Sequence, residues 1–276
     1  MILLLHHRYR HVGGEERAVR DLEWLIREHL HEDVEVLERD SAAVGQRDAA
    51  LGLIRGGLRP DEITKAVQRT GARVVHAHNV NPTFGWRGLA AARQAGARVV
   101  LHLHNYRLVC AVATCFTRGE DCTRCHGRNT LPGLRLNCRG GSRVESAAYA
   151  ASLALWQKRI TGAADEIVVP SAFALARLRE LGAPLGGKAR VLGSVQRDFA
   201  DASNAANGEF VLAAGRLTPE KGFADVLEAC GQAGLPLVIA GDGPQRAELE
   251  ARAAAEGRLA AAGDPMGGGG EKSDRS

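Results

Sequence analysis

The chain has 276 residues, of which 45% are hydrophobic and 25% are charged. This is ordinary globular usage, and a chain of this length can bury a sizeable core, which excludes intrinsic disorder for most of it. The small net charge of +4 argues against a general nucleic-acid-binding protein.

The N-terminal residues lack the features of a targeting segment. The apolar run at residues 2–5 is too short for the core of a signal peptide, and no stretch approaches the ~20 apolar residues of a membrane span. We therefore expect a cytoplasmic protein, in which thiols stay reduced. Its six cysteines then point to metal binding or thiol chemistry before disulfides.

Short apolar runs alternate with helical patterns over the first 197 residues. Strands are predicted at residues 2–5, 34–37, 73–78, 97–104, 166–169 and 191–192, and helices at residues 19–26, 61–67, 90–95, 146–160 and 171–181. This alternation indicates βαβ units and a parallel sheet. We expect residues 1–197 to form a complete Rossmann-like α/β domain, interrupted at residues 105–143 by an insertion rich in Arg, Gly and Cys.

The pattern restarts after a linker at residues 198–209. Strands at residues 210–214 and 235–240, each followed by a helix, predict a second Rossmann-like domain over residues 210–256. The pattern then stops, so this second domain is expected to be truncated. Residues 257–276 are polar and rich in Gly, and we expect a disordered tail there.

Two loops that follow strands of the first domain carry candidate functional residues, because ligands of open parallel sheets bind beyond the carboxyl ends of the strands. Gly13 and Gly14 let backbone N–H groups approach an anionic ligand ahead of a helix, although a plain turn explains them equally well. His104 ends a strand, where a functional and a structural role are equally consistent. His76 and His78, in the neighbouring strand, are interpreted as structural.

The first strand of the second domain is followed by Gly-Arg-Leu-Thr-Pro-Glu-Lys-Gly at residues 215–222. Arg216 and Lys221 stand five residues apart around a helix start, which suits the two cations to hold a diphosphate. The next strand ends in Gly-Asp-Gly-Pro at residues 241–244, which we interpret as a tight strand-to-helix turn.

Taken in order, these motifs resemble the retaining, nucleotide-sugar-dependent glycosyltransferases of family 4. The matching features are Gly-Gly-x-Glu at residues 13–16, His-Asn at 104–105, Val-Pro-Ser at 169–171, the motif at 215–222, and Ala-Gly-Asp-Gly-Pro at 240–244. The resemblance covers about residues 1–256. It implies the GT-B fold, in which two Rossmann-like domains face each other, and sugar transfer from a nucleotide diphosphate sugar to a saccharide or lipid-linked acceptor.

The resemblance also assigns roles to individual residues. Arg216 and Lys221 would hold the diphosphate of the donor and stabilise the leaving group. Gly13 and Gly14 would allow close approach of the backbone to donor and acceptor, and His104 would contact the transferred sugar. No catalytic metal is expected, because two cations and helix-end amides stabilise the departing diphosphate instead.

Two departures from the family pattern bear on activity. The domain junction reads Gly-Ser-Val-Gln-Arg at residues 193–197, where the family has a segment like Asn-Gly-Val-Asp. The Glu-x7-Glu pair of the family is absent because the sequence ends first. Impaired transfer is therefore expected. The alternative is a non-catalytic remnant that acts as a Rossmann binding module with a zinc-ordered lobe. A third interpretation, a GT-B sugar-nucleotide epimerase, would also need the missing second half of the C-terminal domain.

Five of the six cysteines fall within 29 residues of the insertion: Cys110, Cys115, Cys122, Cys125 and Cys138. The spacing of Cys122 and Cys125 lets both thiolates bind one zinc ion. A subset of the resembling glycosyltransferases implies structural zinc at Cys110, Cys122, Cys125 and Cys138, with Cys115 left over. Free or redox-active thiols, disulfides and His126 as a substitute ligand remain alternatives.

The insertion and its flanks are strongly basic, with eight arginines and two acidic residues between Arg98 and Arg143. Such a lobe suits an anionic lipid-linked acceptor or the inner face of a membrane, to which the protein would bind peripherally. A solvated positive face explains the same charges. The helix at residues 147–160 could lie against a membrane, but a helix that faces the core is the better interpretation.

Overall fold

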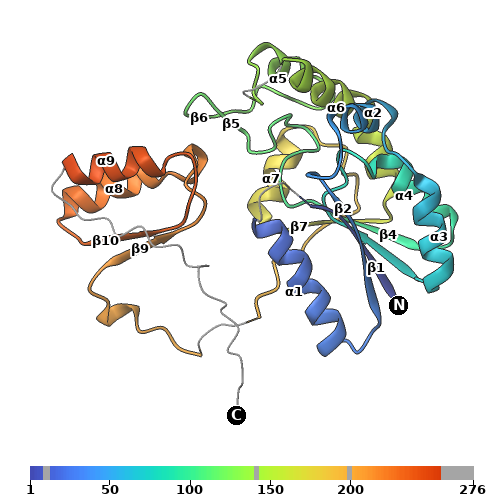
Figure 1. The fold of residues 1–276 in the computed structure, drawn as a ribbon, viewed down its shortest axis with the longest axis horizontal. Helices are drawn as coiled ribbons and strands as arrows, with labels where there is room; N and C mark the ends of the chain where they lie inside the picture. Colours follow the sequence, from blue (N-terminus) through green and yellow to red (C-terminus); the bar gives the residue numbers. More distant parts are fainter. Residues whose placement is uncertain (9–12, 140–142, 198–200, 256–276) are drawn as a thin grey trace. The chain divides into compact units, whose positions relative to one another are not determined.

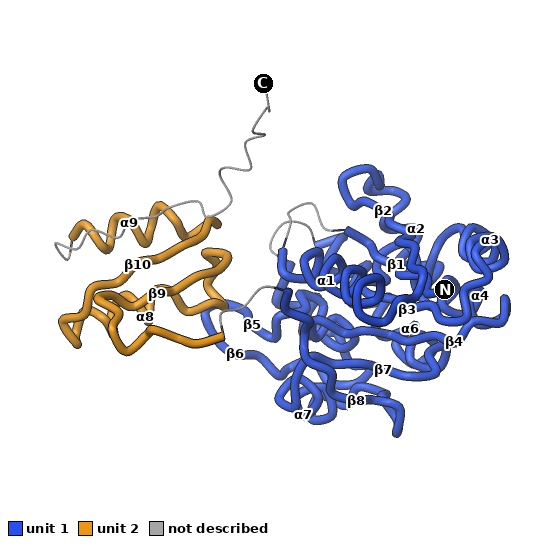
Figure 2. Tube along the Cα trace, turned by 90° about the horizontal axis from the view of Figure 1, so that it is seen from below, with its two compact units in different colours: residues 1–198 blue, residues 199–276 orange. Residues whose placement is uncertain are grey.

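The computed structural model describes residues 1–8, 13–139, 143–197 and 201–255 of the chain (Figure 1). The chain divides into two compact units, Met1–Asp198 and Phe199–Ser276 (Figure 2). The tail predicted to be disordered, residues 257–276, lies outside the described residues.

The first unit is built on a six-stranded parallel sheet of order β2-β1-β3-β4-β7-β8. Its strands are β1 (Ile2–Arg8), β2 (Val34–Asp40), β3 (Val74–Ala77), β4 (Arg98–His102), β7 (Glu166–Val169) and β8 (Ala189–Val191). Apolar runs form most of the central strands β1, β3, β4 and β7, because both faces of a parallel sheet are covered, whereas the edge strand β2 mixes apolar and charged residues. The predicted α/β, Rossmann-like class is confirmed.

Helices cover the two faces of this sheet unequally. They are α1 (Gly14–Glu28), α2 (Gln46–Arg55), α3 (Pro60–Thr70), α4 (Gly85–Gln94), α6 (Arg143–Ala163) and α7 (Ala172–Glu180). The larger core joins Leu3, Leu5 and Val75 of the sheet to buried residues of α3, α4, α6 and α7. On the opposite face, Leu4 and Val34 pack against α1.

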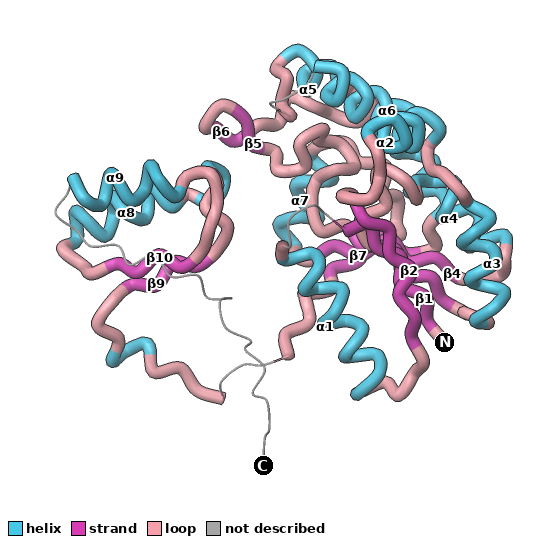
Figure 3. Tube along the Cα trace, in the orientation of Figure 1, coloured by secondary structure: helices cyan, strands magenta, loops and turns pink. Residues whose placement is uncertain are grey.

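The insertion between β4 and α6 is mostly loop (Figure 3), with a short antiparallel hairpin of β5 (Phe116–Thr117) and β6 (Glu120–Asp121) and one turn of helix, α5 (Leu131–Arg135). Two hydrogen bonds fasten it to α6: Thr130 Oγ1 donates to the carbonyl of Ala150 at 2.6 Å, which is buried, and Gln157 Nε2 donates to that of Gly127 at 2.7 Å, which is partly buried. The lobe is therefore anchored to the first unit.

The helix α6 faces the core, in agreement with the better of its two interpretations. Leu153 and Ile160 are buried, and Trp156 Nε1 donates to the carbonyl of Leu53 at 3.0 Å. No helix among the described residues is long and apolar enough to cross a membrane.

The second unit has two parallel strands, β9 (Val211–Ala214) and β10 (Leu237–Ala240), with helices α8 (Phe223–Ala233) and α9 (Arg246–Ala255). Two turns of 3₁₀ helix, η1 (Ala205–Asn207) and η2 (Pro219–Lys221), precede β9 and α8. The small core consists of Leu217, Phe223, Ile239 and Leu249. The two strands and the two helices are elements that the sequence predicts for this part of the chain, whereas the two 3₁₀ turns were not predicted.

Candidate functional site

The carboxyl edge of the second unit's sheet carries the two predicted diphosphate-binding cations. Arg216 follows β9, and Lys221 ends the 3₁₀ turn that precedes α8. Both side chains are exposed, and within the described residues neither makes a hydrogen bond or an ion pair. Both cations are thus available to an anion beside the start of an 11-residue helix, whose N-terminus favours negative charge.

Glycines bring the two strand-end loops of this unit into backbone contact. The N–H of Gly215 donates to the carbonyl of Ala240 at 2.9 Å, and that of Leu217 donates to Asp242 at 2.9 Å. A Cβ on Gly241 would lie 1.9 Å from the carbonyl oxygen of Gly215. Only glycine fits this approach, so the loop that carries Arg216 is held firmly by its neighbour.

In the first unit, Gly13 and Gly14 stand where α1 begins. The N–H of Gly13 donates to Glu16 Oε2 at 2.8 Å, and Glu15 Oε1 accepts the N–H of Asn79, which follows β3, at 3.0 Å. An anion at Gly13 would compete with Glu16 for that amide. Gly14 is open with respect to the described residues, because a Cβ added there would meet none of their atoms within 4 Å.

His104 lies two residues beyond β4 and is half-buried. Its Nε2 is 2.8 Å from Nδ1 of His78, and its ring stacks on that of His102 with 4.0 Å between centroids. Burial and, secondarily, the neighbouring imidazoles lower the pKa of His104 to about 3. At neutral pH the ring is neutral, so it can offer a substrate a hydrogen bond but no charge.

The structure gathers more histidines around His104 than the sequence analysis anticipated. The histidines whose rings stack, or meet edge to face, in this cluster are His6, His76, His78, His102 and His104. The ligand atoms of His76, His78 and His102 lie within 4.8 Å of one another, close enough to hold a metal ion. His-x-His in two consecutive predicted strands was the available signal, because alternate residues share a face.

Burial lowers the pKa of these histidines. The pKa falls to about 3 for His76 and to about 4 for His102, and for His78 it falls well below the usual range. Desolvation is the largest cause in each case, since it penalises the charged imidazolium. The cluster is therefore a set of neutral imidazoles at neutral pH.

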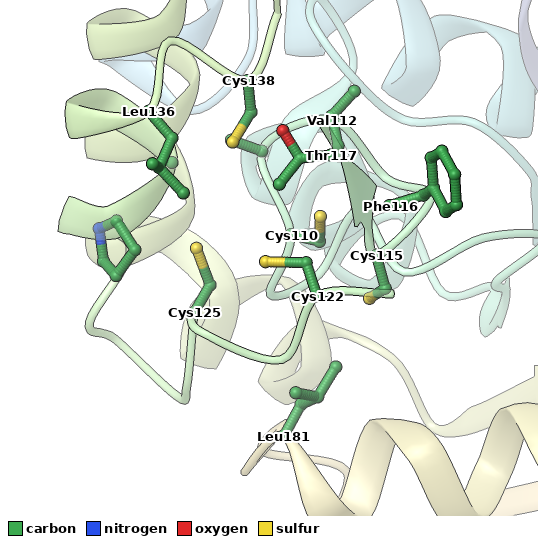
Figure 4. A pocket seen from close by; sticks show the side chains of 13 residues that line it. Cys110, Val112, Cys115, Phe116, Thr117, Cys122, Cys125, Leu136, Cys138 and Leu181 are labelled. Atoms are coloured by element: carbon green, nitrogen blue, oxygen red, sulfur yellow. The ribbon is translucent and has the colours of Figure 1, made fainter. Parts of the chain in front are cut away.

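All five cysteines of the insertion line one small cavity of about 10 Å³. Figure 4 shows the sulfurs of Cys110, Cys122, Cys125 and Cys138 turned towards a common space, while that of Cys115 points away from it. In the part of the chain that the structure describes, these sulfurs do not form a group of three close enough together to hold a metal ion. The cavity has room for an ion or one water molecule and none for a substrate.

The thiols of this cavity differ in acidity. A hydrogen bond with Cys115 lowers the pKa of Cys110 to about 6, while the same contact and burial raise the pKa of Cys115. Burial raises the pKa of Cys125 to about 11 and also raises that of Cys138. Cys110 thus ionises more readily than Cys115, Cys125 and Cys138.

Comparison with known families covers most of the chain. Residues 12–192 match the model of the glycosyl transferase 4-like domain, and residues 195–260 match that of the glycosyl transferases group 1. No curated protein matches the sequence.

Solved structures with a related chain course share little sequence with this protein. MurG of Acinetobacter baumannii has a TM-score of 0.44 and 11% identity, over 92% of this chain and 62% of that one. The lipopolysaccharide outer core galactosyltransferase WaaB has a TM-score of 0.48 and 12% identity, over 93% of this chain and 65% of that one. A UDP-glucosyltransferase from Polygonum tinctorium has a TM-score of 0.45 and 13% identity, over 94% of this chain and 71% of that one. The chain thus spans less than two thirds of the length of the first two.

Proposed function

The chain belongs to the glycosyl transferase 4-like family, and from that premise we propose that it transfers a sugar from a nucleotide diphosphate sugar to a saccharide or lipid-linked acceptor with retention of the anomeric configuration. The observation that carries the proposal is the pair of exposed, unpartnered cations, Arg216 and Lys221, at the carboxyl edge of the second unit's described strands.

The two cations act on the donor's diphosphate. Negative charge develops on the leaving nucleoside diphosphate as the bond to the sugar breaks. The guanidinium of Arg216 and the ammonium of Lys221, with the amides at the start of α8, stabilise that charge without reorganising. The close contact between Gly215 and Gly241 holds the Arg216 loop in place for this purpose.

His104 contacts the transferred sugar. Its neutral ring donates a hydrogen bond to a hydroxyl or accepts one from it, and the 2.8 Å contact with His78 fixes the orientation of the ring. Gly14 provides the close backbone approach in the first unit, since a Cβ there would meet no atom of the described residues within 4 Å. The backbone N–H of Gly13 can bind the ligand only if the ligand displaces the Glu16 carboxylate that accepts its hydrogen bond.

Structural zinc at Cys110, Cys122, Cys125 and Cys138 orders the insertion. Their orientation towards one cavity supports this assignment, and four thiolates suit tetrahedral zinc. The sulfurs would have to close in on the ion, which a mostly loop segment permits. His126 is a substitute ligand, and free thiols are the competing state.

The insertion is also the proposed acceptor side of the molecule. Arg118, Arg124 and Arg135 are exposed on it, and such charges attract an anionic lipid-linked acceptor or a cytoplasmic membrane surface. The protein would then act in the cytoplasm, bound peripherally to the inner membrane face. Neither role calls for nucleic acid.

Donor turnover tests the proposal. The protein is incubated with a panel of UDP-, GDP- and ADP-sugars, with and without glycoside acceptors, and proton NMR follows the anomeric signals. We expect one donor to be consumed with its anomeric configuration retained, and Arg216→Gln and Lys221→Gln to lose at least ~100-fold in rate. Arg252→Gln, which removes the same charge from α9, serves as the control.

Two outcomes contradict the proposal in different ways. A product of inverted configuration would exclude the retaining reaction. Folded protein that binds a nucleotide but consumes no donor would favour the alternative function, a Rossmann binding module with a zinc-ordered lobe.

A further inference from the structure

The histidine face of the first unit lies on the side of the sheet that α1 covers. Leu4 of β1 is in register with His76 of β3, and Leu4 packs against residues of α1. His76 is in turn in register with Val100 of β4, so His102, two residues on, shares that face. Parallel pairing thus places histidines from neighbouring strands on one surface.

The distance between one ring nitrogen of His76 and one of His102 matches that of two nitrogens bound to the same metal ion. His76 Nε2 lies 3.3 Å from His102 Nδ1. Two imidazole nitrogens bound to one tetrahedral zinc ion at 2.0–2.1 Å are about 3.3–3.4 Å apart. With His78, the three ligand atoms fit within 4.8 Å of one another.

The hydrogen bonding of His78 is that of a metal ligand. Its Nε2 is buried and has no hydrogen-bond partner among the described residues, while its Nδ1 faces His104 Nε2 at 2.8 Å. A histidine that binds a metal through one nitrogen commonly donates its other N–H to a neighbour, which fixes the tautomer. His104 fills that supporting place.

We propose that His76, His78 and His102 form a binding site for one divalent transition-metal ion of the zinc class, supported by His104. Three imidazoles suit Zn²⁺, Co²⁺, Ni²⁺ or Cu²⁺ and not Mg²⁺ or Ca²⁺, which prefer oxygen ligands. Of the three ligands, His76 is the one that is not fully buried. The site is separate from the cysteine cavity and needs no part of the second unit.

The ion would act on the sugar-contacting residue indirectly. With His78 bound through Nε2, its Nδ1–H donates to Nε2 of His104, which leaves the proton of His104 on Nδ1. The metal therefore selects one tautomer of His104. This consequence alone rests on the proposed function; the metal site does not.

Cobalt titration of the full chain tests the site. The background variant Cys122→Ser/Cys125→Ser breaks the predicted thiolate site, so that thiolate-to-cobalt charge-transfer absorption is removed. We expect one equivalent of Co²⁺ to bind with visible d–d bands only. His76→Asn and His102→Gln should each weaken binding by more than ~100-fold, and His104→Gln by ~10–100-fold, as for a supporting group.

The matched control is His31→Asn, because His31 is exposed, lies outside the cluster and has a φ of 50°, which asparagine tolerates. Circular dichroism verifies that each variant is folded. X-ray absorption at the zinc edge of the background variant needs no histidine change, and nitrogen neighbours at about 2.0 Å without sulfur are expected.

Failure to bind stoichiometric Co²⁺ in the background variant would overturn the proposal. So would Co²⁺ binding of equal strength in His76→Asn and His102→Gln. Because these readouts involve no nucleotide sugar, they stand or fall independently of the transfer reaction.

Discussion

His7 occupies an enclosed position on β1, with 1% of its surface exposed. Its Nδ1 faces Thr83 Oγ1 at 3.1 Å, and its ring meets the edge of Phe84. Arg39 lies over the same Phe84 ring, 4.4 Å from its centroid. Burial and then the charge of Arg39 lower the pKa of His7 to about 4.

Acid should therefore destabilise the first unit. Unfolded His7 takes up a proton near pH 6.5, but the native residue does so only near pH 4. Between these values the unfolded state binds more protons, so stability falls as the pH falls, by up to about 3 kcal/mol from this residue. Urea unfolding at pH 7 and pH 4.5 measures the loss.

The variant His7→Gln separates this residue from the other buried histidines, whose lowered pKa values act in the same direction. Its urea midpoint should change less between pH 7 and pH 4.5 than that of the wild type. An identical pH dependence in the two proteins would show that folding does not lower the pKa of His7.

At the scale of elements, Gly241 governs the pairing of the two strand-end loops in the second unit. Its φ is 151°, and a Cβ there would stand 1.9 Å from the carbonyl oxygen of Gly215. Gly241→Ala should destabilise this unit by ~3 kcal/mol, because the backbones must separate. Gly234→Ala meets open space and carries only the strain of a φ of 66°, so it should cost ~1 kcal/mol. Thermal unfolding compares them, and equal losses would refute the steric argument.

The strands and long helices could be predicted from the sequence because each has an apolar pattern of its own. The end of β1 could not, since His6 and His7 extend it to Arg8 with polar side chains that only the fold buries. The helix α2 was missed because its sequence contains Gly52 beside few buried residues. The β5–β6 hairpin was missed because two-residue strands have no detectable pattern.

The candidate site divides in the same way. Arg216 and Lys221 could be placed from sequence because each is fixed by a local loop. The association of His76, His78 and His102 depends on the register of β3 against β4, which no local pattern states. Reading each histidine alone therefore assigned His76 and His78 a structural role.

At the scale of the whole molecule, the second unit is the less well packed part. Its two strands each pair with a single neighbour among the described residues. Large apolar side chains remain exposed around them: Leu212 by 61%, Phe210 by 54% and Leu235 by 50%. A two-stranded sheet is stable only when other elements, such as helices, pack against it. Exposed strand edges also favour association with other chains.

Limited proteolysis should therefore cleave residues 201–255 before residues 13–139. Mass spectrometry of the fragments identifies the order of cleavage, and a resistant fragment spanning the first unit is expected. Equal resistance of the two units would show that the second is as stable as the first.

The proposed transfer rests most directly on nucleotide binding at Arg216 and Lys221, and a thermal-shift panel with UDP, GDP, ADP and their sugar conjugates measures it. A nucleotide at 100 times its Kd should stabilise the folded state by ~2.7 kcal/mol. We predict such a shift for one nucleotide base, lost in Arg216→Gln and Lys221→Gln and kept in Arg252→Gln. The assignment of the donor site would be contradicted if none of the nucleotides raised the melting temperature of the folded protein. It would also be contradicted if a nucleotide raised the melting temperature equally in all three variants.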